Sequence, residues 1–560
     1  APGGTLTLRT LLLTFALSAS AFAQAAAKYP PEVKAGVDRI TPATVRAPLT
    51  LIADDLFEGR APGTRGGELA AKYIASRLEA MGLDPAGTNG SYFQQVPFRE
   101  FTVIPDKCDA YGDQSGMVGP LGKFGEDYII LGSPFETSFD IEGKVVFVGY
   151  GAVVPSHKID DYAGIDAKGK FVAIFRGGSP ALPPEERAHY STAMMLQAEA
   201  ARHGAIGIVL LPTPESEKES PFKKLAENVD QPGLRWIGPD GKPVGHPEIR
   251  ATVAISPALA EQVFLTSPSS TEEIFAALNA GKPQPFDTPY ALKLHVETSH
   301  RDIMSPNVLA IRRGSDPKLK DEFVVYSAHY DHLGIGKPVN GDSVYNGAWD
   351  NATGVTSVLN IAEAFSALPK APARSILFAF VTGEEKGLLG SDYFAEYPTV
   401  PKQSMIADLN IDMIPFFTAY KEVVVGPDRV GMNAAIQRVA TAIGLPVVEP
   451  AKDAPQRGSF MTRSDGYSFI RRGIPTVSIT MRGDQKNIDE FRKLYGTRYH
   501  QPNDDLTMPF NWEAGAMFAR AQFLLGYEIA NSRTRPSWRN DDWLAVAFGR
   551  ESQSQAAGNK

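Results

Sequence analysis

The amino-acid sequence predicts an α/β fold in which a mostly parallel mixed sheet is flanked by helices and accompanied by an inserted β-rich domain. After Asn307, short apolar runs alternate with amphipathic helical segments, which is typical of strands that pair in parallel. Within 126–285 the pattern differs, because turn residues lead repeatedly into short apolar strands. A helix near Gly67 has no full set of packing partners in its own segment. We therefore expect 30–125 and 286–530 to form one discontinuous domain around the insert.

The first predicted helix begins near Gly67, and the β-rich segment follows it. Apolar side chains recur at helical spacing from Gly67 to Met81, and Gly82 follows as a stop signal. In the insert, two similar Gly-Lys turns lead into apolar runs, and an Ala-rich helix precedes a third such run. These elements are strands over 145–148 and 171–175, a helix over 194–203 and a strand within 204–211. Proline, glycine and charged residues dominate 212–247, which predicts long loops.

The part of the chain after the insert shows the clearest alternation of strands and helices. Its predicted elements are strand 323–326, helix 352–368, strands 376–381, 406–411 and 423–425, helix 433–443 and strand 476–479. Because parallel strands need crossover connections, such helices should cover both faces of the sheet.

Composition excludes several classes of protein. The 560 residues are 43% hydrophobic and 21% charged, which is typical of a globular chain and too apolar for a disordered one. The formal net charge is −8, so no global positive field favours nucleic acid or an anionic membrane. Cys108 is the only cysteine, which excludes an intrachain disulfide and a thiolate zinc site. Any metal site must therefore use histidines and carboxylates.

The N-terminal segment has the pattern of an export signal. Arg9 precedes an apolar run from Leu11 to Ala23, and Ala21-Phe22-Ala23 matches a signal-peptidase site with cleavage after Ala23. The alternative is a membrane anchor, but a spanning helix needs ~20 apolar residues and this run is shorter. We expect 1–23 to be a cleaved signal peptide, the mature protein to be periplasmic or secreted, and 531–560 to be a C-terminal tail.

Polar residues that can bind metal follow the predicted strands at their carboxyl ends, where open α/β sheets collect ligands. Each of them alone is ordinary, since an Asp before a helix is commonly a cap and a Glu pair on a turn is commonly solvated. Together they form a set of His and carboxylate side chains that suits a divalent cation. The candidates are His329, Asp331, Asp350, Glu384, Glu385, Asp412 and His500.

Charge balance favours two ions at this set. Three carboxylate ligands and two neutral imidazoles leave two divalent cations with a single excess positive charge, which one bound hydroxide cancels. One carboxylate must then bridge the two ions. Asp350, placed at a helix start between the other loops, is the best candidate for the bridge.

Five short strings in this region resemble the metal-site motifs of the co-catalytic zinc aminopeptidases, peptidase family M28, whose relatives include bacterial leucyl aminopeptidase, glutamate carboxypeptidase, glutaminyl cyclase and transferrin receptor. They are AHYDH at 328–332, NGAWDN at 346–351, TGEEKG at 382–387, NIDM at 410–413 and YH at 499–500. The resemblance runs from about Leu49 to Gly526 and includes EGRAPGT at 58–64. It implies a zinc-exopeptidase type of fold, and the inserted segment is similar to a protease-associated domain.

Transferred position by position, the resemblance implies two Zn²⁺ per chain. One ion would bind His329 and Asp412, the other would bind Glu385 and His500, and Asp350 would bridge them. The implied set therefore contains five metal ligands and leaves room for water and substrate.

The same resemblance implies roles for three further residues. Glu384 matches the general base, Asp331 matches the carboxylate that orients His329, and Tyr467 is a candidate for steadying the oxyanion. Gly466 departs from the family pattern, which often has histidine there. His332 matches no ligand position and is expected to be a loop residue.

The implied function is an exported zinc-dependent aminopeptidase that removes N-terminal residues from peptides by means of a metal-bridged hydroxide and a glutamate base. Its partners would be peptide substrates with a free N-terminus, without nucleic acid or a membrane span. A carboxypeptidase acting on acidic C-termini is the main alternative and would need an arginine cluster, for which Arg463, Arg471, Arg472 and Arg482 are available. A glutaminyl cyclase and a non-catalytic binding protein on the same fold are weaker alternatives, because all five ligand positions are retained.

Overall fold

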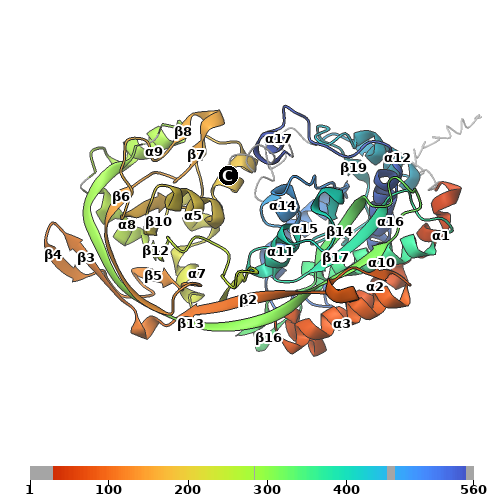
Figure 1. Ribbon diagram of the computed structural model, residues 1–560, viewed down its shortest axis with the longest axis horizontal. Helices are drawn as coiled ribbons and strands as arrows, with labels where there is room; N and C mark the ends of the chain where they lie inside the picture. The colour runs from red at the N-terminus through yellow and green to blue at the C-terminus, as the bar shows by residue number, and fades with distance from the viewer. Residues whose placement is uncertain (1–28, 266, 283, 451–460, 550–560) are drawn as a thin grey trace, which may run out of the picture.

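The computed structural model describes residues 29–265, 267–282, 284–450 and 461–549. The predicted signal peptide 1–23 and the end of the predicted tail, 550–560, lie outside the described residues. Figure 1 shows two bodies joined by a long two-stranded ribbon made of β2 and β13. The larger body contains the alternating second part of the chain. The smaller one is the β-rich body.

The sheet of the larger body is mixed. Its strands lie in the order β18-β14-β17-β13, with β2 and β1 paired to β13. β14 pairs in parallel with both β17 and β18, whereas β13 runs antiparallel to β17. The predicted α/β class with a large mixed sheet flanked by helices is thus confirmed. The bounds are β1 Asp84–Pro85, β2 Phe93–Val103, β13 Phe286–Arg312, β14 Phe323–His329, β17 Ser375–Val381 and β18 Met405–Asn410.

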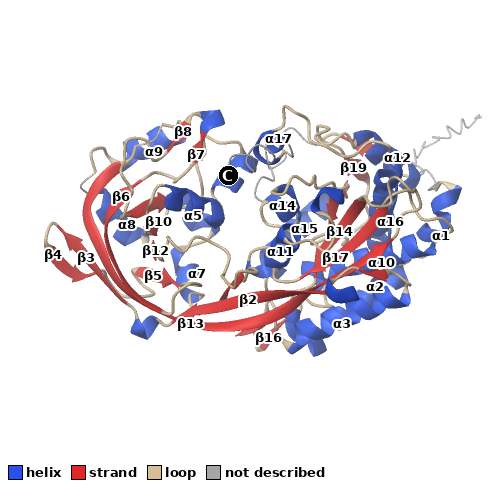
Figure 2. Ribbon diagram, in the orientation of Figure 1, coloured by secondary structure: helices blue, strands red, loops and turns tan. Residues whose placement is uncertain are grey.

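Helices cover both faces of this sheet (Figure 2). Because successive side chains of a strand point to opposite faces, β14 divides its residues between two cores. Val324 and Tyr326 pack into the larger core, and Phe323 and Val325 pack into the smaller one. The larger core contains α1 Lys34–Val37, α2 Pro42–Ile52, α3 Arg65–Ala80, α10 Thr353–Ala367, α12 Asn433–Ile443 and α16 Trp512–Asn531, and the smaller one contains α11 Leu389–Glu396 and α14 Gly466–Ile470.

The helix predicted near Gly67 is confirmed as α3. Its start is fixed by Thr64, whose hydroxyl accepts a hydrogen bond from the backbone N–H of Gly67. It ends before Gly82, which has a φ of +70° that favours glycine. The predicted helix over 433–443 is also confirmed as α12, and Gly444 ends it in the same left-handed conformation.

α16 is the longest helix of the described chain, with 20 residues. It packs beside α10, α12 and α2 and carries Glu513, Arg520 and Glu528. In the part of the chain that the structure describes, neither α16 nor any other helix has the length and apolar character needed to cross a membrane.

The β-rich body has its own core around the sheet β13-β6-β9-β10-β12-β5. That core begins at Val103 and ends at Val296, so it extends beyond the predicted 126–285 at both ends. The reason is that β2 and β13 pass from one body to the other without a break, and no local signal marks the crossing. Its elements are β3 Asp109–Gln114, β4 Met117–Pro120, β5 Tyr128–Leu131, β6 Ser138–Phe147, β9 Phe171–Phe175, β10 Gly207–Leu211 and β12 Ala251–Ile255, with α4 Pro184–Tyr190, α5 Ala193–Arg202, α8 Pro257–Phe264 and α9 Thr271–Asn279.

The segment 212–247 is more regular than the predicted long loops. It contains α6 Pro214–Glu219, α7 Phe222–Glu227 and β11 Gly233–Trp236. Thr213 and Ser216 form a capping box, and Pro214 occupies the first helical position of α6. These are start signals that the density of proline and charge obscured.

Two predicted strands do not join the main sheet as expected. Within 476–479 only Thr476 pairs, through an isolated parallel bridge to Asp408. β19 (Glu422–Val424) lies in a separate small sheet between β20 (Val447–Val448) and β21 (Thr480–Arg482). Apolar runs alone do not specify their partners, which explains the difference.

Candidate metal centre

The predicted metal ligands meet at the carboxyl edge of the parallel strands. His329 is the last residue of β14, the Glu384-Glu385 pair follows β17 after two residues, and Asp412 follows β18. Because β17 and β18 flank β14 in parallel, their loops leave the sheet at one edge. The strand topology thus gathers residues that lie far apart in the sequence.

Asp350 occupies the middle of the cluster. It lies in an irregular turn, Ala348–Ala352, directly before α10. Its Oδ1 is 3.3 Å from Nε2 of His329, and its Oδ2 is 3.3 Å from Nε2 of His500. One carboxylate therefore presents its two oxygens to two different imidazoles, which is the arrangement that a bridging ligand requires.

The two remaining carboxylates each join one side of Asp350. Asp412 Oδ1 lies 3.3 Å from Nε2 of His329, and Glu385 Oε2 lies 3.1 Å from Nε2 of His500. The donor atoms of His329, Asp350 and Asp412 all lie within 4.8 Å of one another. The structure thus brings together all five side chains that the sequence nominated as ligands.

The chemistry of this donor set fits divalent cations. Carboxylate oxygens and imidazole nitrogens converge without a thiolate, and in the described part of the chain no lysine or arginine side chain pairs with these five groups. Burial raises the pKa of Asp412, and burial together with Glu385 and Asp412 raises that of Glu384 well above its ordinary value. Buried carboxylates at such distances need added positive charge, which bound cations would supply.

The two histidines change the pKa values of the carboxylates around them. Burial alone would raise the pKa of Asp350, but hydrogen bonds with His329 and His500 hold it far below its ordinary value. Burial opposes protonation of His500, yet the hydrogen bonds that its ring donates to Asp350 and Glu385 raise its pKa to about 10. A divalent cation bound between these groups would replace the positive charge of protonated imidazoles, since imidazole binds metal in its neutral form.

Comparison with known proteins now identifies this region. Residues 307–525 match the family model described as Peptidase family M28. These residues form an M28 peptidase domain. All five candidate ligands lie within the matched range.

Two curated relatives match part of the chain. Probable leucine aminopeptidase 2 of Aspergillus fumigatus is 28% identical over 246 residues, which cover 40% of this chain and 44% of that protein. Aminopeptidase Y of Saccharomyces cerevisiae is 25% identical over 234 residues, covering 40% of this chain and 39% of that protein. The chain thus spans less than half the length of these relatives.

A solved structure shares the fold over most of the chain. The aminopeptidase from Aneurinibacillus sp. strain AM-1 aligns with a TM-score of 0.50 at 17% identity, covering 90% of this chain and 97% of that one. The similarity therefore includes both the M28 domain and the arrangement around it.

Asp331 acts on the M28 cluster differently from the prediction. Nδ1 of His329 donates to the backbone carbonyl of Asp331 at 3.1 Å, whereas the Asp331 carboxylate is 3.8 Å from that nitrogen. The carboxylate instead accepts hydrogen bonds from the backbone N–H groups of Glu384, at 3.2 Å, and Glu385, at 3.4 Å. Asp331 thus fixes the ring of His329 through its main chain and the glutamate turn through its side chain.

Asp504 is a buried carboxylate that sequence reasoning missed. It accepts hydrogen bonds from the backbone N–H of Trp349, at 2.8 Å, and of Asp350, at 3.0 Å. Burial raises its pKa to about 6. The only sequence signal for this role is that Asp504 lies four residues after His500. The same loop therefore contacts both the backbone of Asp350, through Asp504, and its carboxylate, through His500.

Arg60 joins the loops that carry the ligands. Its fully buried guanidinium donates to the carbonyl of Tyr330 at 2.7 Å and to those of Asn346 and Gly347 at 2.5 and 3.0 Å. Tyr330 follows the ligand His329, and Gly347 precedes the turn of Asp350. The string at 58–64 is visible in the sequence. Its contacts with these loops join residues more than 250 positions apart, so no local pattern predicts them.

His332 differs from the prediction that it is an ordinary loop residue. It lies outside helix and strand, but it is buried, and its Nδ1 is 2.6 Å from Oε1 of Glu385. Glu385 is therefore held between His332 on one oxygen and His500 on the other.

Tyr467 is not joined to the cluster by any hydrogen bond between described residues. Its buried hydroxyl lies 2.5 Å from Nδ1 of His189, on α4 of the β-rich body. Lys386 likewise points to the β-rich body and donates to the carbonyl of Pro232 at 3.2 Å. Both residues flank the M28 site and contact the neighbouring body.

Proposed function

We propose that this protein is a zinc-dependent aminopeptidase with two metal ions at the cluster centred on Asp350. The observation that carries the proposal is the position of the Asp350 carboxylate, whose oxygens each lie 3.3 Å from Nε2 of a different histidine. His329 and Asp412 would hold one ion, and Glu385 and His500 the other. The names of the two curated relatives support an aminopeptidase.

Two cations bound there would polarise the scissile carbonyl and acidify a water molecule between them. Glu384 would accept the proton of that water, a role supported by the distance of 3.9 Å between its Oε2 and Nε2 of His329. Burial, with Glu385 and Asp412 nearby, raises the pKa of Glu384, which brings a carboxylate closer to the range where it can take and return a proton. Asp331 holds the backbone of this glutamate in place.

An exopeptidase must recognise either an ammonium or a carboxylate at the end of its substrate. The buried carboxylates around Asp350 favour an ammonium, and thus a free N-terminus. The arginines that a carboxypeptidase would need are occupied. Arg471 and Arg472 pair with Asp392 at 2.7 and 2.6 Å, Arg482 pairs with Glu422, and Arg463 donates to the hydroxyl of Tyr499 at 3.1 Å.

The proposal includes two features that rest on the sequence. Residues 1–23 would direct export and be removed after Ala23, so a secreted form would begin at Gln24. The β-rich body would be a protease-associated domain beside the M28 domain. Sequencing the N-terminus of exported protein tests the first feature directly.

The activity is tested with three peptides that differ only at their ends. One has a free N-terminus, one is N-acetylated, and one ends in glutamate behind an acetylated N-terminus. We expect that only the first peptide loses its N-terminal residues one by one, as monitored by mass spectrometry. Metal analysis of the same sample should give two zinc ions per chain. Release of C-terminal glutamate from the third peptide would contradict the proposal in favour of a carboxypeptidase.

A further inference from the structure

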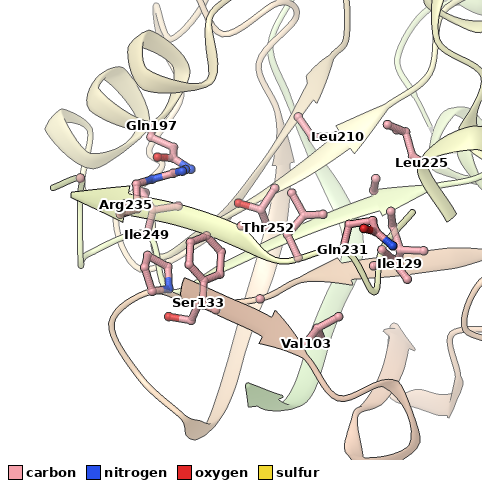
Figure 3. A pocket seen from close by; sticks show the side chains of 18 of the residues that line it. Val103, Ile129, Ser133, Gln197, Leu210, Leu225, Gln231, Arg235, Ile249 and Thr252 are labelled. Atoms are coloured by element: carbon pink, nitrogen blue, oxygen red, sulfur yellow. The ribbon is translucent and has the colours of Figure 1, made fainter. Parts of the chain in front are cut away.

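The β-rich body contains a cavity that is separate from the metal cluster (Figure 3). Its volume is about 530 Å³, within the range of small-molecule sites. It lies between the sheet strands β10, β12 and β5 on one side and the strands β11 and β2 on the other.

The charged side chains that line this cavity are all basic, although the whole chain has a net charge of −8. Arg250 pairs with Glu136, and Arg176 lies 3.4 Å from Glu217. Arg235 differs from both, because no carboxylate pairs with it among the described residues. Its guanidinium donates to the carbonyl of Leu234 and lies over the ring of Phe101.

The partial burial of Arg235 is consistent with a guanidinium that has no paired carboxylate. Burial lowers its pKa, and no neighbouring acid opposes the shift. A cation that is partly removed from water without a counter-charge is costly, and an anionic ligand would offset that cost.

Arg235 lies at one end of a cavity whose lining is largely apolar. Figure 3 shows Arg235 with Gln197 and Ile249 at one end, and Leu225 and Ile129 with Gln231 at the opposite end. Val103 contributes a further apolar side chain from β2. A guanidinium without a paired carboxylate, in a largely apolar lining, matches a ligand that has one charged group and an apolar body.

We propose that the cavity binds a small organic anion that has one carboxylate and an apolar body, with the carboxylate held by Arg235. The same chemistry is offered by the C-terminal end of a short apolar peptide and by a free fatty acid. Binding here does not depend on the proposed peptidase activity.

The wall of the cavity also touches the larger body. Along β11, Arg235 faces the cavity, while the next residue, Trp236, donates its indole N–H to Asp392 on α11 at 2.9 Å. The residue before β11, Pro232, accepts the hydrogen bond from Lys386, which directly follows Glu385. An occupied cavity would therefore order the segment that contacts the glutamate turn.

Isothermal titration of the zinc-loaded full chain tests the proposal with three probes: decanoate, N-acetyl-leucyl-leucine and its C-terminal amide. We expect saturable binding of at least one carboxylate probe. A charge-assisted hydrogen bond contributes about 1.5–3 kcal/mol, so Arg235→Gln should weaken that binding by about tenfold or more. Arg301→Gln removes an exposed arginine of β13 that pairs with Glu100 of β2, and this control should leave the affinity for the probe unchanged. Whichever carboxylate probe binds more tightly identifies the source of the ligand.

A second variant keeps the test decisive if Arg235→Gln unfolds. Leu225→Glu places a carboxylate at the end opposite Arg235, on the half-buried face of α7, and should abolish binding without affecting the arginine. Equal affinity of the acid and the amide, unchanged affinity in Arg235→Gln, or no saturable binding of any probe would each overturn the proposal. If the probe carboxylates bound at the metal ions instead, Arg235→Gln would leave their affinity unchanged, which is one of the results that overturn the proposal.

Discussion

The carboxylate of Asp504 accepts a hydrogen bond from the backbone N–H of Asp350 at 3.0 Å, so one buried acid fixes the main chain that carries the proposed bridging ligand. Its other oxygen accepts from the N–H of Trp349. Because groups that hold a ligand in place tune metal affinity, the consequence of removing Asp504 should appear in metal binding first.

We expect Asp504→Asn to lower zinc affinity by about 10- to 100-fold, since the amide has a single acceptor oxygen and can keep only one of the two hydrogen bonds, while its NH2 group faces the other backbone N–H. Competition with a chelator of known affinity measures the change. Asp489→Asn, at an exposed site on α15 (Gln485–Arg498), is the matched control and should behave as wild type. Unchanged zinc affinity in Asp504→Asn would show that Asp350 is positioned by other contacts.

Glu384→Gln should keep both metal ions and the fold but lower kcat by about 10²- to 10⁴-fold, because the amide cannot accept a proton. Steady-state kinetics and metal analysis on one sample separate the two effects. Glu363→Gln, on the far side of α10 beside Arg77, serves as control. Activity near that of wild type would exclude Glu384 as the general base.

His332 should act by holding Glu385. We expect His332→Ala to lower the affinity for one of two zinc ions, and His332→Asn to restore part of it, because the asparagine amide can reach the position of Nδ1. Stepwise zinc titration with a chromophoric chelator distinguishes the two binding events. If alanine and asparagine variants bind both ions as tightly as wild type, the contact with Glu385 has no influence on the site.

Asp161 in the β-rich body gives a prediction for the pH dependence of stability. Burial raises its pKa from 3.8 to about 7, and its Oδ2 accepts from the N–H groups of Tyr150 and Ala152. A raised carboxyl pKa means that the contribution to stability is complete below about pH 4 and is lost as the pH rises to about 7. Asp161→Asn keeps the acceptor oxygen and removes that loss.

We therefore expect Asp161→Asn to match the wild-type Tm at pH 4 and to exceed it at pH 8. Since 1 kcal/mol corresponds to about 2–4 °C in domains of this size, a gain of a few degrees is expected. Glu272→Gln, at an exposed position in the first turn of α9 in the same body, is the control. An equal Tm difference at both pH values would contradict the assigned ionisation.

The fold and the ligand set were predictable where the sequence signal is local. The strand over 171–175 and the helix over 433–443 have the predicted bounds, because each is a short apolar pattern between clear turn or stop residues. Four of the five candidate ligands could be placed because each ends, follows or precedes such an element, whereas His500 has no predicted strand or helix directly before it.

The features that the sequence did not predict depend on contacts between distant segments. Arg60 binds carbonyl groups that lie more than 250 positions away, and Asp504 acts on a turn that lies more than 150 positions before it. The strand predicted over 476–479 forms only a bridge, since pairing depends on the neighbour and not on the apolar run. His332 was set aside because no motif position matched it, and only the fold shows its contact with Glu385.

The central claim is that Asp350 bridges two metal ions, and anomalous diffraction from zinc-loaded crystals at the zinc absorption edge tests it most directly. The account predicts two anomalous peaks about 3.5–4 Å apart, each ~2.0–2.2 Å from a different oxygen of Asp350. One peak should adjoin His329 and Asp412, and the other should adjoin Glu385 and His500. A single peak, or two peaks that do not share Asp350, would contradict it.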